Sequence, residues 1–326
     1  MKILITGGAG FIGSNLALQH LNKEDSVWVV DNLSTGRIEN LNAAFGHPHF
    51  RFSKADLNTW EELTQAVIWA DAIYHMAAIV GQKVVIKHPV AVLCENIHGC
   101  ERLLKIMAQH KKDCRLLIAS TSEVYGTEGT SSFKEDAPIT FPSGKCVQVN
   151  YSLSKFVDEA LVLSYVHEHG LNGVIARLFN TTGPNQTGRY GMVVPRFIAQ
   201  AAEKLPITVY GTGEQTRSFC DIRDTCSLLN TLLNDKAATG EIFNVGNDRE
   251  ISILDLAKLV KERAHSPSEI IHIPYEEAYG MPFQDTLRRC PDLTKVKSRY
   301  KFEPQWSLEN TLDTLLQLTQ TAHKPY

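Results

Sequence analysis

Short apolar runs alternate with longer amphipathic stretches over the first 180 residues of the chain. The apolar runs predict strands at residues 2–6, 26–30, 50–56, 72–78, 115–120 and 173–180. Between them, apolar side chains recur at helical spacing over residues 12–22, 60–68, 91–110 and 151–169. The strand runs are hydrophobic throughout, which is typical of a parallel sheet covered on both faces. The pattern predicts an α/β fold with a doubly wound, Rossmann-like parallel sheet.

The alternation ends near residue 180, where the turn-rich stretch TTGPNQTGRYG begins. The strands predicted beyond it are short, at residues 207–211, 241–246 and 270–275, and helices are predicted at 194–204, 253–263 and 308–320. This change predicts a sheet domain over residues 1–180 and a smaller C-terminal lobe over 181–326, with segments at about 215–250 returning to the first domain. A ligand is expected between the two, at the carboxyl ends of the strands.

Composition excludes several classes of protein. The net charge of −3 and the lack of a basic run give no indication of nucleic-acid binding. The chain has no run of about 20 apolar residues, so no membrane span is predicted. Because the opening MKILITGG leads directly into a predicted strand, no signal peptide is expected. Seven cysteines without a CxxC pair indicate reduced thiols and a cytoplasmic protein. Twelve histidines without HxxxH or HExxH spacing predict no metal site.

A glycine-rich turn, GGAGFIG at residues 7–13, follows the first predicted strand and opens the first helix. Glycines permit the tight turn and let backbone amides approach a pyrophosphate at the helix N-terminus. This context predicts a dinucleotide site. The residues expected to form it are Gly7, Gly10, Phe11, Ile12 and Gly13.

The second predicted strand is followed by Asp31, 18 residues after Gly13 (31 − 13). An acid at this place bonds the adenosine ribose hydroxyls and repels a 2′-phosphate, so the predicted cofactor is NAD. Arg37 lies close enough in sequence to weaken this preference slightly. Asp56, at the end of the third strand, either meets the adenine or is a solvated carboxylate.

The sequence YSLSK at residues 151–155 places Tyr151 and Lys155 one helical turn apart on the same face. A tyrosine with its usual pKa of about 10 is a poor base at neutral pH. A nearby lysine ammonium stabilises the phenolate and lowers that pKa. We expect the pair to act as the acid/base of a hydride transfer, taking a hydroxyl proton as hydride leaves the same carbon.

Together these motifs resemble the extended short-chain dehydrogenases/reductases, in the NAD-dependent nucleotide-sugar epimerase/dehydratase branch. The resemblance covers nearly the whole chain. The residues that carry it are Gly7, Gly10, Gly13, Asp31, Asn32, Asp56, Leu57, the HMAA run at 75–78, Thr121, Tyr151, Lys155, Phe179, Asn180, VVP at 193–195, YGTGEQTRSF at 210–219 and RRCPDLTK at 288–295.

The resemblance implies a role for individual residues. Thr121 would bond the sugar 4-hydroxyl beside Tyr151, and Lys155 would also hold the nicotinamide ribose. Besides the glycine turn, the implied cofactor contacts are Asp31, Asn32, Asp56, Leu57, Ala77, Ala78, Tyr151 and Lys155. The implied substrate contacts are Ser122, Asn180, Val194, Arg217, Asp285 and Arg289, with the arginines and Asn180 on a nucleotide diphosphate. The resemblance also implies a homodimer through the helices at 91–110 and 151–169, packed as a four-helix bundle.

Glu123, in the run STSEVYG at residues 120–126, separates the members of the branch. A 4-epimerase needs Thr121, Tyr151 and Lys155 only, whereas UDP-glucuronate decarboxylases place a glutamate beside the threonine. The Thr-Asp-Glu of 4,6-dehydratases is absent because Ser122 replaces the aspartate. Glu123 either contacts C5 or C6 of the sugar or bonds backbone amides under the loop.

The helix sequence YSLSK and the loop GRYGMVVPRF, at residues 188–197, are closer to the 4-epimerases. We therefore expect conversion of a UDP-sugar through a 4-keto intermediate, with a UDP-hexose 4-epimerase as the main hypothesis. The alternatives are a UDP-glucuronate decarboxylase and a UDP-sugar dehydratase. Arg223 either faces a uronate carboxylate, as in some decarboxylases, or pairs with a neighbouring acid. A non-catalytic sensor of NAD or sugar nucleotides is disfavoured by the intact Thr121, Tyr151 and Lys155.

Overall fold

A central sheet of seven parallel strands organises the computed structural model, which describes residues 1–126, 132–141, 147–188, 192–279 and 285–322. The strand order is β11-β6-β5-β4-β1-β2-β3. The strands are β1 (Lys2–Thr6), β2 (Ser26–Asp31), β3 (Phe50–Lys54), β4 (Ala72–His75), β5 (Arg115–Thr121), β6 (Asn172–Leu178) and β11 (Ile242–Val245). Because the chain continues from β1 to one side and returns on the other at β4, a crevice forms at their carboxyl ends.

Helices cover both faces of the sheet, as the continuous strand runs predicted. One face packs on α1 (Phe11–Leu21), α7 (Ile222–Asn234) and α10 (Thr294–Tyr300). The other packs on α2 (Leu63–Trp69), α4 (Pro89–His110) and α5 (Asn150–His169). In β1, Ile3 and Ile5 point to the first layer and Leu4 to the second, so successive residues are buried on opposite sides.

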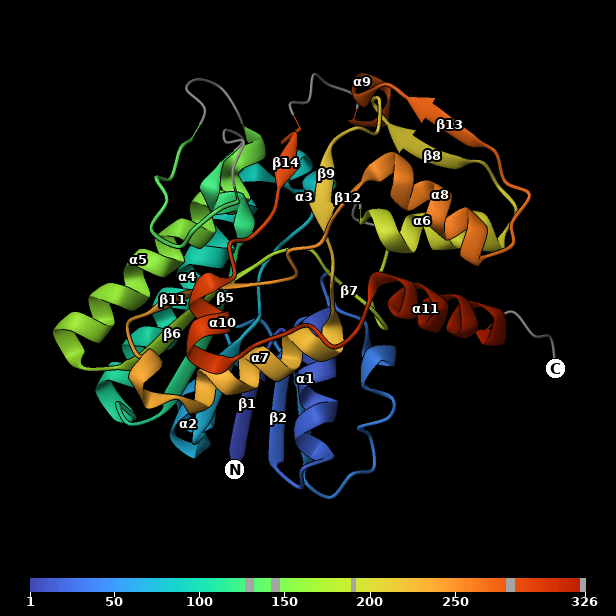
Figure 1. Ribbon diagram of the computed structural model, residues 1–326. Helices are drawn as coiled ribbons and strands as arrows, with labels where there is room; N and C mark the ends of the chain where they lie inside the picture. Colours follow the sequence, from blue (N-terminus) through green and yellow to red (C-terminus); the bar gives the residue numbers. More distant parts are fainter. Residues whose placement is uncertain (127–131, 142–146, 189–191, 280–284, 323–326) are drawn as a thin grey trace.

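A smaller lobe lies above the carboxyl ends of the strands (Figure 1). Its core joins α6 (Val193–Ala202), β8 (Ile207–Tyr210), α8 (Ile253–Arg263) and α11 (Leu308–Ala322). Its strand β13 (Ile270–Ile273) pairs with β8 and leads to α9 (Tyr275–Tyr279). Amphipathic spacing predicted α6, α8 and α11 from sequence, because each buries one apolar stripe against this core.

The remaining elements are short and lie between the larger ones. They are β7 (Thr181–Thr182), β9 (Thr216–Ser218), β10 (Cys220–Asp221), β12 (Glu250–Ser252), β14 (Arg288–Arg289), α3 (Gln82–Lys87), η1 (Ile38–Leu41), η2 (Ser122–Tyr125), η3 (Val147–Val149) and η4 (Lys236–Ala238). The strand order β12-β9-β14 places Arg289 directly beside Arg217. Among the helices of the described residues, none is long and apolar enough to cross a lipid bilayer.

Helix α7 is absent from the helices predicted by sequence. Its buried side includes polar residues, Asp224, Thr225 and Asn230, which interrupt the apolar stripe. These groups are satisfied by distant segments: the Tyr74 hydroxyl donates to Asn230, and Asp224 accepts backbone N–H bonds from Gln305 and Trp306. Helix α7 therefore combines apolar residues buried in the core, such as Ile222, Leu229 and Leu233, with buried polar groups that bond to distant segments.

Candidate active site

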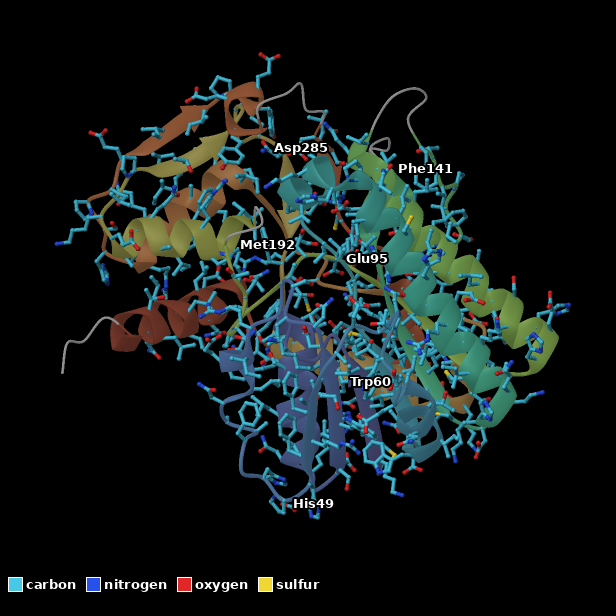
Figure 2. All side chains as sticks on the ribbon, turned by 180° about the vertical axis from the view of Figure 1, so that it is seen from behind. His49, Trp60, Glu95, Phe141, Met192 and Asp285 are labelled. Carbon is cyan, nitrogen blue, oxygen red and sulfur yellow. The ribbon has the colours of Figure 1, made fainter. Side chains whose placement is uncertain are left out.

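A pocket of ≈ 380 Å³ opens at the carboxyl ends of β1, β4, β5 and β6, beneath the smaller lobe. It receives residues from the glycine turn, from the ends of these strands and from α6. Seen from behind, Glu95 of α4 and Met192, just before α6, lie on opposite sides of the junction between sheet and lobe (Figure 2). The pocket thus lies at the reversal of strand order, where the topology predicts a ligand.

The glycine turn is packed too closely for side chains. Gly7 has a φ of +68°, and a Cβ there would lie 2.6 Å from the backbone nitrogen of Ala77. A Cβ on Gly13 would lie 2.4 Å from the Gly7 carbonyl oxygen. Gly7, Gly10, Phe11, Ile12 and Gly13 all line the pocket. The turn therefore offers backbone N–H groups at the start of α1, which suits a pyrophosphate.

Gly13→Ala is expected to weaken NAD binding about tenfold or more, because the added methyl forces the loop away from its close contact with the Gly7 carbonyl. Calorimetric titration of the purified protein with NAD measures the change. Gly46→Ala is the control, since its Cβ meets nothing within 4 Å and Gly46 does not line the pocket. Equal NAD affinity in the two variants would contradict the role given to the turn.

Asp31 ends β2 against the glycine turn. Its carboxylate accepts backbone N–H bonds from Ala9 at 3.0 Å and from Leu33 at 2.8 Å, and burial raises its pKa. A Cβ on Gly36 would lie 2.8 Å from the same carboxylate, so the backbone comes close to it on the pocket side. Arg37 pairs instead with Glu39 at 3.5 Å. Asp31 is therefore positioned to accept a hydrogen bond from a ribose hydroxyl, while Arg37 is paired with Glu39.

The remaining residues expected to contact the cofactor also line the pocket. Asn32 donates to the Asp56 carboxylate at 2.9 Å, so the ends of β2 and β3 are joined by their side chains. Leu57 lies beside Asp56, and Ala77 and Ala78 follow β4. These side chains and the closely packed glycine turn fit an adenine dinucleotide.

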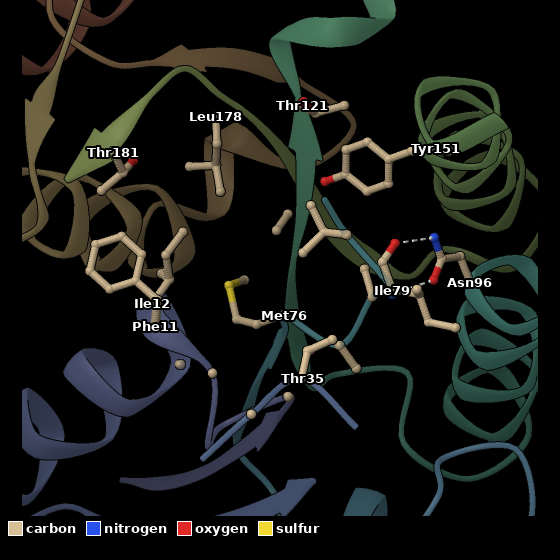
Figure 3. Close-up of a pocket in the computed structure, with 18 of the residues that line it drawn as sticks. Phe11, Ile12, Thr35, Met76, Ile79, Asn96, Thr121, Tyr151, Leu178 and Thr181 are labelled. Atoms are coloured by element: carbon tan, nitrogen blue, oxygen red, sulfur yellow. Dashed lines mark hydrogen bonds between the residues drawn. The ribbon is translucent and has the colours of Figure 1, made fainter. Parts of the chain in front are cut away.

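Tyr151 lies near the start of α5, and its hydroxyl points into the pocket beside the end of β5 (Figure 3). Burial raises the pKa of Tyr151 to about 12; Lys155 and the Thr121 hydroxyl act against this rise, while Glu123 adds to it. Thr121, Ser122 and Glu123 line the same part of the pocket. The structure therefore brings three further predicted residues, Thr121, Ser122 and Glu123, to the part of the pocket that contains the Tyr151 hydroxyl.

Lys155 lies one turn further along α5 and is only 1% exposed. Its ammonium donates to Asp158 at 2.7 Å. The nearby His75 is hydrogen-bonded to Thr6, with 2.7 Å between His75 Nδ1 and Thr6 Oγ1. Burial, and after it the charge of Lys155, lowers the pKa of His75 to about 3. His75 is therefore neutral, and Lys155 and Asp158 carry the charge beneath the pocket.

Glu123 projects toward a cation from the lobe. Its carboxylate accepts from the Gln82 amide at 3.4 Å and lies 3.8 Å from the Arg289 guanidinium. Arg289 also donates to the Thr286 hydroxyl at 3.0 Å, and its Nε is buried without a hydrogen-bond partner among the described residues. Both Glu123 and Arg289 line the pocket. Glu123 thus interacts with side chains in the described contacts, rather than with backbone amides under its loop.

The other residues expected to bind substrate divide into two groups. Asn180 and Val194 line the pocket. Arg217 and Asp285 lie outside its lining, in a partly buried pair with N–O distance 2.6 Å, and the Tyr275 hydroxyl donates to the same carboxylate at 2.7 Å. Burial lowers the pKa of Arg217. In this structure Arg217 is bound to protein groups and only Arg289 of the adjacent pair reaches the pocket.

The profile described as GDP-mannose 4,6 dehydratase matches residues 4–315 of the chain. The chain belongs to the NAD-dependent nucleotide-sugar epimerase/dehydratase family of extended short-chain dehydrogenases/reductases. As a member of this family it is an enzyme.

Relatives within the family carry different reaction names. The UDP-N-acetyl-alpha-D-glucosaminuronate decarboxylase of Bacillus cytotoxicus is 35% identical over 318 residues, 97% of each chain. UDP-glucuronic acid decarboxylase 1 of Arabidopsis thaliana is 34% identical over 97% of this chain and 69% of that protein. The crystal structure of UDP-glucuronic acid 4-epimerase from Bacillus cereus, in complex with UDP-glucuronic acid and NAD, has a TM-score of 0.88 at 27% identity, covering 99% of this chain and 100% of that chain.

Arg223, which resembles a uronate-facing arginine of some family members, does not reach the pocket lining. Its guanidinium bonds both oxygens of Asp221, at 2.8 and 2.6 Å, and stacks over the Trp306 ring. This agrees with the second interpretation, a pair with a neighbouring acid. The arginine that lies near Glu123 is Arg289, which the resemblance assigned to the nucleotide diphosphate.

Three residues that shape the pocket were not predicted from the sequence. Asn96 of α4 donates to Ser154 at 3.0 Å and accepts from the Ile79 backbone, which holds the pocket wall (Figure 3). Gln82 bonds Glu123, and no motif pointed to it. Asp158 could have been found, because a carboxylate three residues after a catalytic lysine lies on the same helical face.

Proposed function

We propose that the protein is an NAD-dependent UDP-uronate decarboxylase. The observation that carries the proposal is the meeting of Glu123 and Arg289 in the pocket that contains Tyr151. Of the four acids that line the pocket in the described residues, Asp31, Asp56, Glu95 and Glu123, the last is the one adjoining Thr121. A guanidinium beside it provides a site for an anionic group on the sugar, such as a C6 carboxylate.

The relatives support the same substrate class. The two decarboxylases named above and the structurally similar 4-epimerase all take their names from uronates. This substrate class favours the decarboxylase over the UDP-hexose 4-epimerase, which was the main hypothesis from the sequence. A single substrate class, a UDP-sugar with a carboxylate at C6, accounts for the names and for an arginine in the pocket.

We propose NAD as the cofactor, held by the glycine turn and by Asp31, with Ala77 and Ala78 along its length. Once bound, NAD would accept a hydride from C4 of the sugar and return it, so that no net redox change results. Family members bind NAD, as in the Bacillus cereus complex. The buried carboxylate of Asp31 and the outward pairing of Arg37 favour NAD over its 2′-phosphorylated form.

Tyr151 would remove the proton of the sugar 4-hydroxyl, with Thr121 orienting that hydroxyl and Lys155 stabilising the phenolate. The resulting 4-ketone makes the C6 carboxylate a β-keto acid. The C5–C6 bond then breaks, carbon dioxide leaves, and the bonding pair moves to an enolate at C4. Protonation at C5 restores the ketone, for which Glu123 is placed beside Thr121. The balance is one UDP-uronate and one proton giving one UDP-pentose, or its amino-sugar counterpart, and one carbon dioxide.

The test is incubation of the enzyme and NAD with UDP-glucuronate and UDP-N-acetylglucosaminuronate labelled with carbon-13 at C6. Released labelled carbon dioxide, together with a product lacking C6 by mass spectrometry, is the expected result. Unchanged mass with an inverted C4 signal in the NMR spectrum would replace the decarboxylase by a 4-epimerase. Loss of water would identify a dehydratase.

Glu123→Gln is expected to lower the rate of decarboxylation about 100-fold, because the amide neither passes a proton to C5 nor balances the Arg289 charge. NAD affinity should stay unchanged, since the cofactor residues are separate. The matched control is Glu214→Gln, a change of the same kind at an exposed acid on the lobe. A Glu123→Gln enzyme as fast as the control would show that the glutamate is structural.

The 4-epimerase remains the second candidate because of the YSLSK helix sequence, and the loop at 188–197 contributed to that interpretation. Residues 189–191 of this loop lie outside the described residues. We also propose the division at residue 180, the homodimer through α4 and α5, and the individual substrate roles assigned to Ser122, Asn180, Val194, Arg217 and Asp285. For Arg289 we propose the sugar carboxylate in place of the nucleotide diphosphate that the resemblance implied.

A further inference from the structure

Helix α5 carries a carboxyl group directly behind its catalytic motif; burial raises the pKa of this Asp158 carboxyl, and Lys155 acts against the rise. Asp158, three residues after Lys155, accepts a hydrogen bond from the lysine ammonium at 2.7 Å. The side chains are 0% and 1% exposed, respectively. The next residue, Glu159, points elsewhere and pairs with Arg177 of β6. Lys155 therefore has a dedicated buried counterion of its own.

A buried ion pair is poor evidence of a stabilising role, because the cost of desolvating two charges offsets their attraction. Packed apolar side chains in place of both members of such a pair are often as stable or more stable. The location of the pair suggests another purpose. Tyr151 lies one turn before Lys155, and the ionisation of its hydroxyl responds to every charge in this buried region.

The groups around the pair come from several elements. On α5 they are Tyr151, Lys155, Asp158 and Glu159; α4 contributes the Cys100 thiol, β4 the neutral His75, and η2 the Glu123 carboxylate. Among these groups Lys155 is the cation, while Asp158 and Glu123 are the acids that oppose ionisation of Tyr151. Burial lowers the pKa of Lys155, but Asp158 and Tyr151 outweigh burial and raise it, so the lysine stays charged.

We propose that Asp158 is a positioning residue which holds Lys155 in place and, by offsetting its charge, sets the pH range in which Tyr151 acts as a base. The inference rests on the proposed role of Tyr151. The negative charge of Asp158 partly cancels the electrostatic effect of Lys155 on the Tyr151 phenol. The hydroxyl then keeps its proton to higher pH and can return a proton late in the cycle, when the 4-keto sugar is reduced.

Asp158→Asn tests this, because the amide has nearly the same shape and no charge. The rising limb of kcat against pH, which reports deprotonation of Tyr151, is expected to move about one unit or more toward low pH. Asp158→Glu should restore the wild-type limb, since it keeps the charge. Glu168→Gln, an equal change of charge at an exposed site on α5, should leave the limb in place.

A second readout does not require turnover. The absorbance of tyrosinate is titrated with NAD bound, and the same titration of a Tyr151→Phe background is subtracted, which isolates the Tyr151 hydroxyl. This titration should show the same downward shift in Asp158→Asn even if no decarboxylation is found, so failure of the proposed reaction and failure of this inference are separable. Should Asp158→Asn fail to fold, Asp158→Ser carries the same expectation.

Two outcomes would overturn the proposal. A uniformly slower Asp158→Asn enzyme, with its pH limb and its tyrosinate titration unmoved, would reduce Asp158 to a structural residue. A limb moved toward high pH would show that Asp158 serves to keep Lys155 charged, against the offsetting role proposed.

Discussion

Tyr151→Phe is expected to lower kcat by about 10²- to 10⁴-fold, because the phenol is the group that moves the proton of the sugar 4-hydroxyl. The ring continues to fill its place at the start of α5, so the fold and the NAD affinity should be retained. Steady-state assay of carbon dioxide release measures the loss, and NAD titration measures what is kept. The matched control is Tyr165→Phe, on the same helix and outside the pocket lining.

The split between kcat and NAD affinity distinguishes catalysis from binding. If Tyr151→Phe turned over as fast as Tyr165→Phe, the acid/base role would have to pass to another pocket group, with Glu123 as the first candidate. A parallel loss of NAD affinity would instead show that the hydroxyl serves mainly to hold the cofactor.

Arg177→Met is expected to destabilise the protein by about 3–5 kcal/mol, because it leaves the Glu159 carboxylate buried without its cation. Arg177 bonds both oxygens of Glu159, at 2.9 and 2.8 Å, and the two side chains are 2% and 1% exposed. Its guanidinium also lies over the Tyr125 ring and donates to the Glu135 carbonyl at 3.0 Å. Urea unfolding followed by circular dichroism gives the change in free energy.

Two further variants complete this measurement. Adding Glu159→Gln to Arg177→Met removes the unpaired charge and should recover part of the lost stability. Lys258→Met breaks a pair in which both side chains are 60% exposed, and should change stability by less than about 1 kcal/mol. If Arg177→Met lowered the free energy of unfolding no more than Lys258→Met does, water or a shift of α5 would have to solvate the Glu159 carboxylate.

Local pattern was sufficient for most of the fold and for choosing the residues of the glycine turn and β2 that meet at the pocket. Strand β1 was predicted at its observed bounds, and α8 likewise, because each is an uninterrupted apolar run or stripe bounded by clear turn or capping signals. The glycine turn and Asp31 could be placed because a dinucleotide cradle is formed within one strand–turn–helix unit and the next strand. Helix α7 was missed because its buried polar residues have partners far away in the sequence.

The sequence by itself determined the doubly wound sheet, the glycine turn and the Tyr151–Lys155 pair, since periodicity and short spacing specify contacts within one element or between neighbours. Only the tertiary structure decided what surrounds them. The pairing of β9 with β14 places Arg289 beside Arg217, and Arg289 lies near Glu123. Arg223, which the sequence offered as an arginine that faces a uronate, pairs with Asp221 instead. Burial made Asp158 a counterion of Lys155 rather than a solvated acid. These contacts join segments distant in the chain, and their strength depends on the exclusion of water, which a sequence pattern does not record.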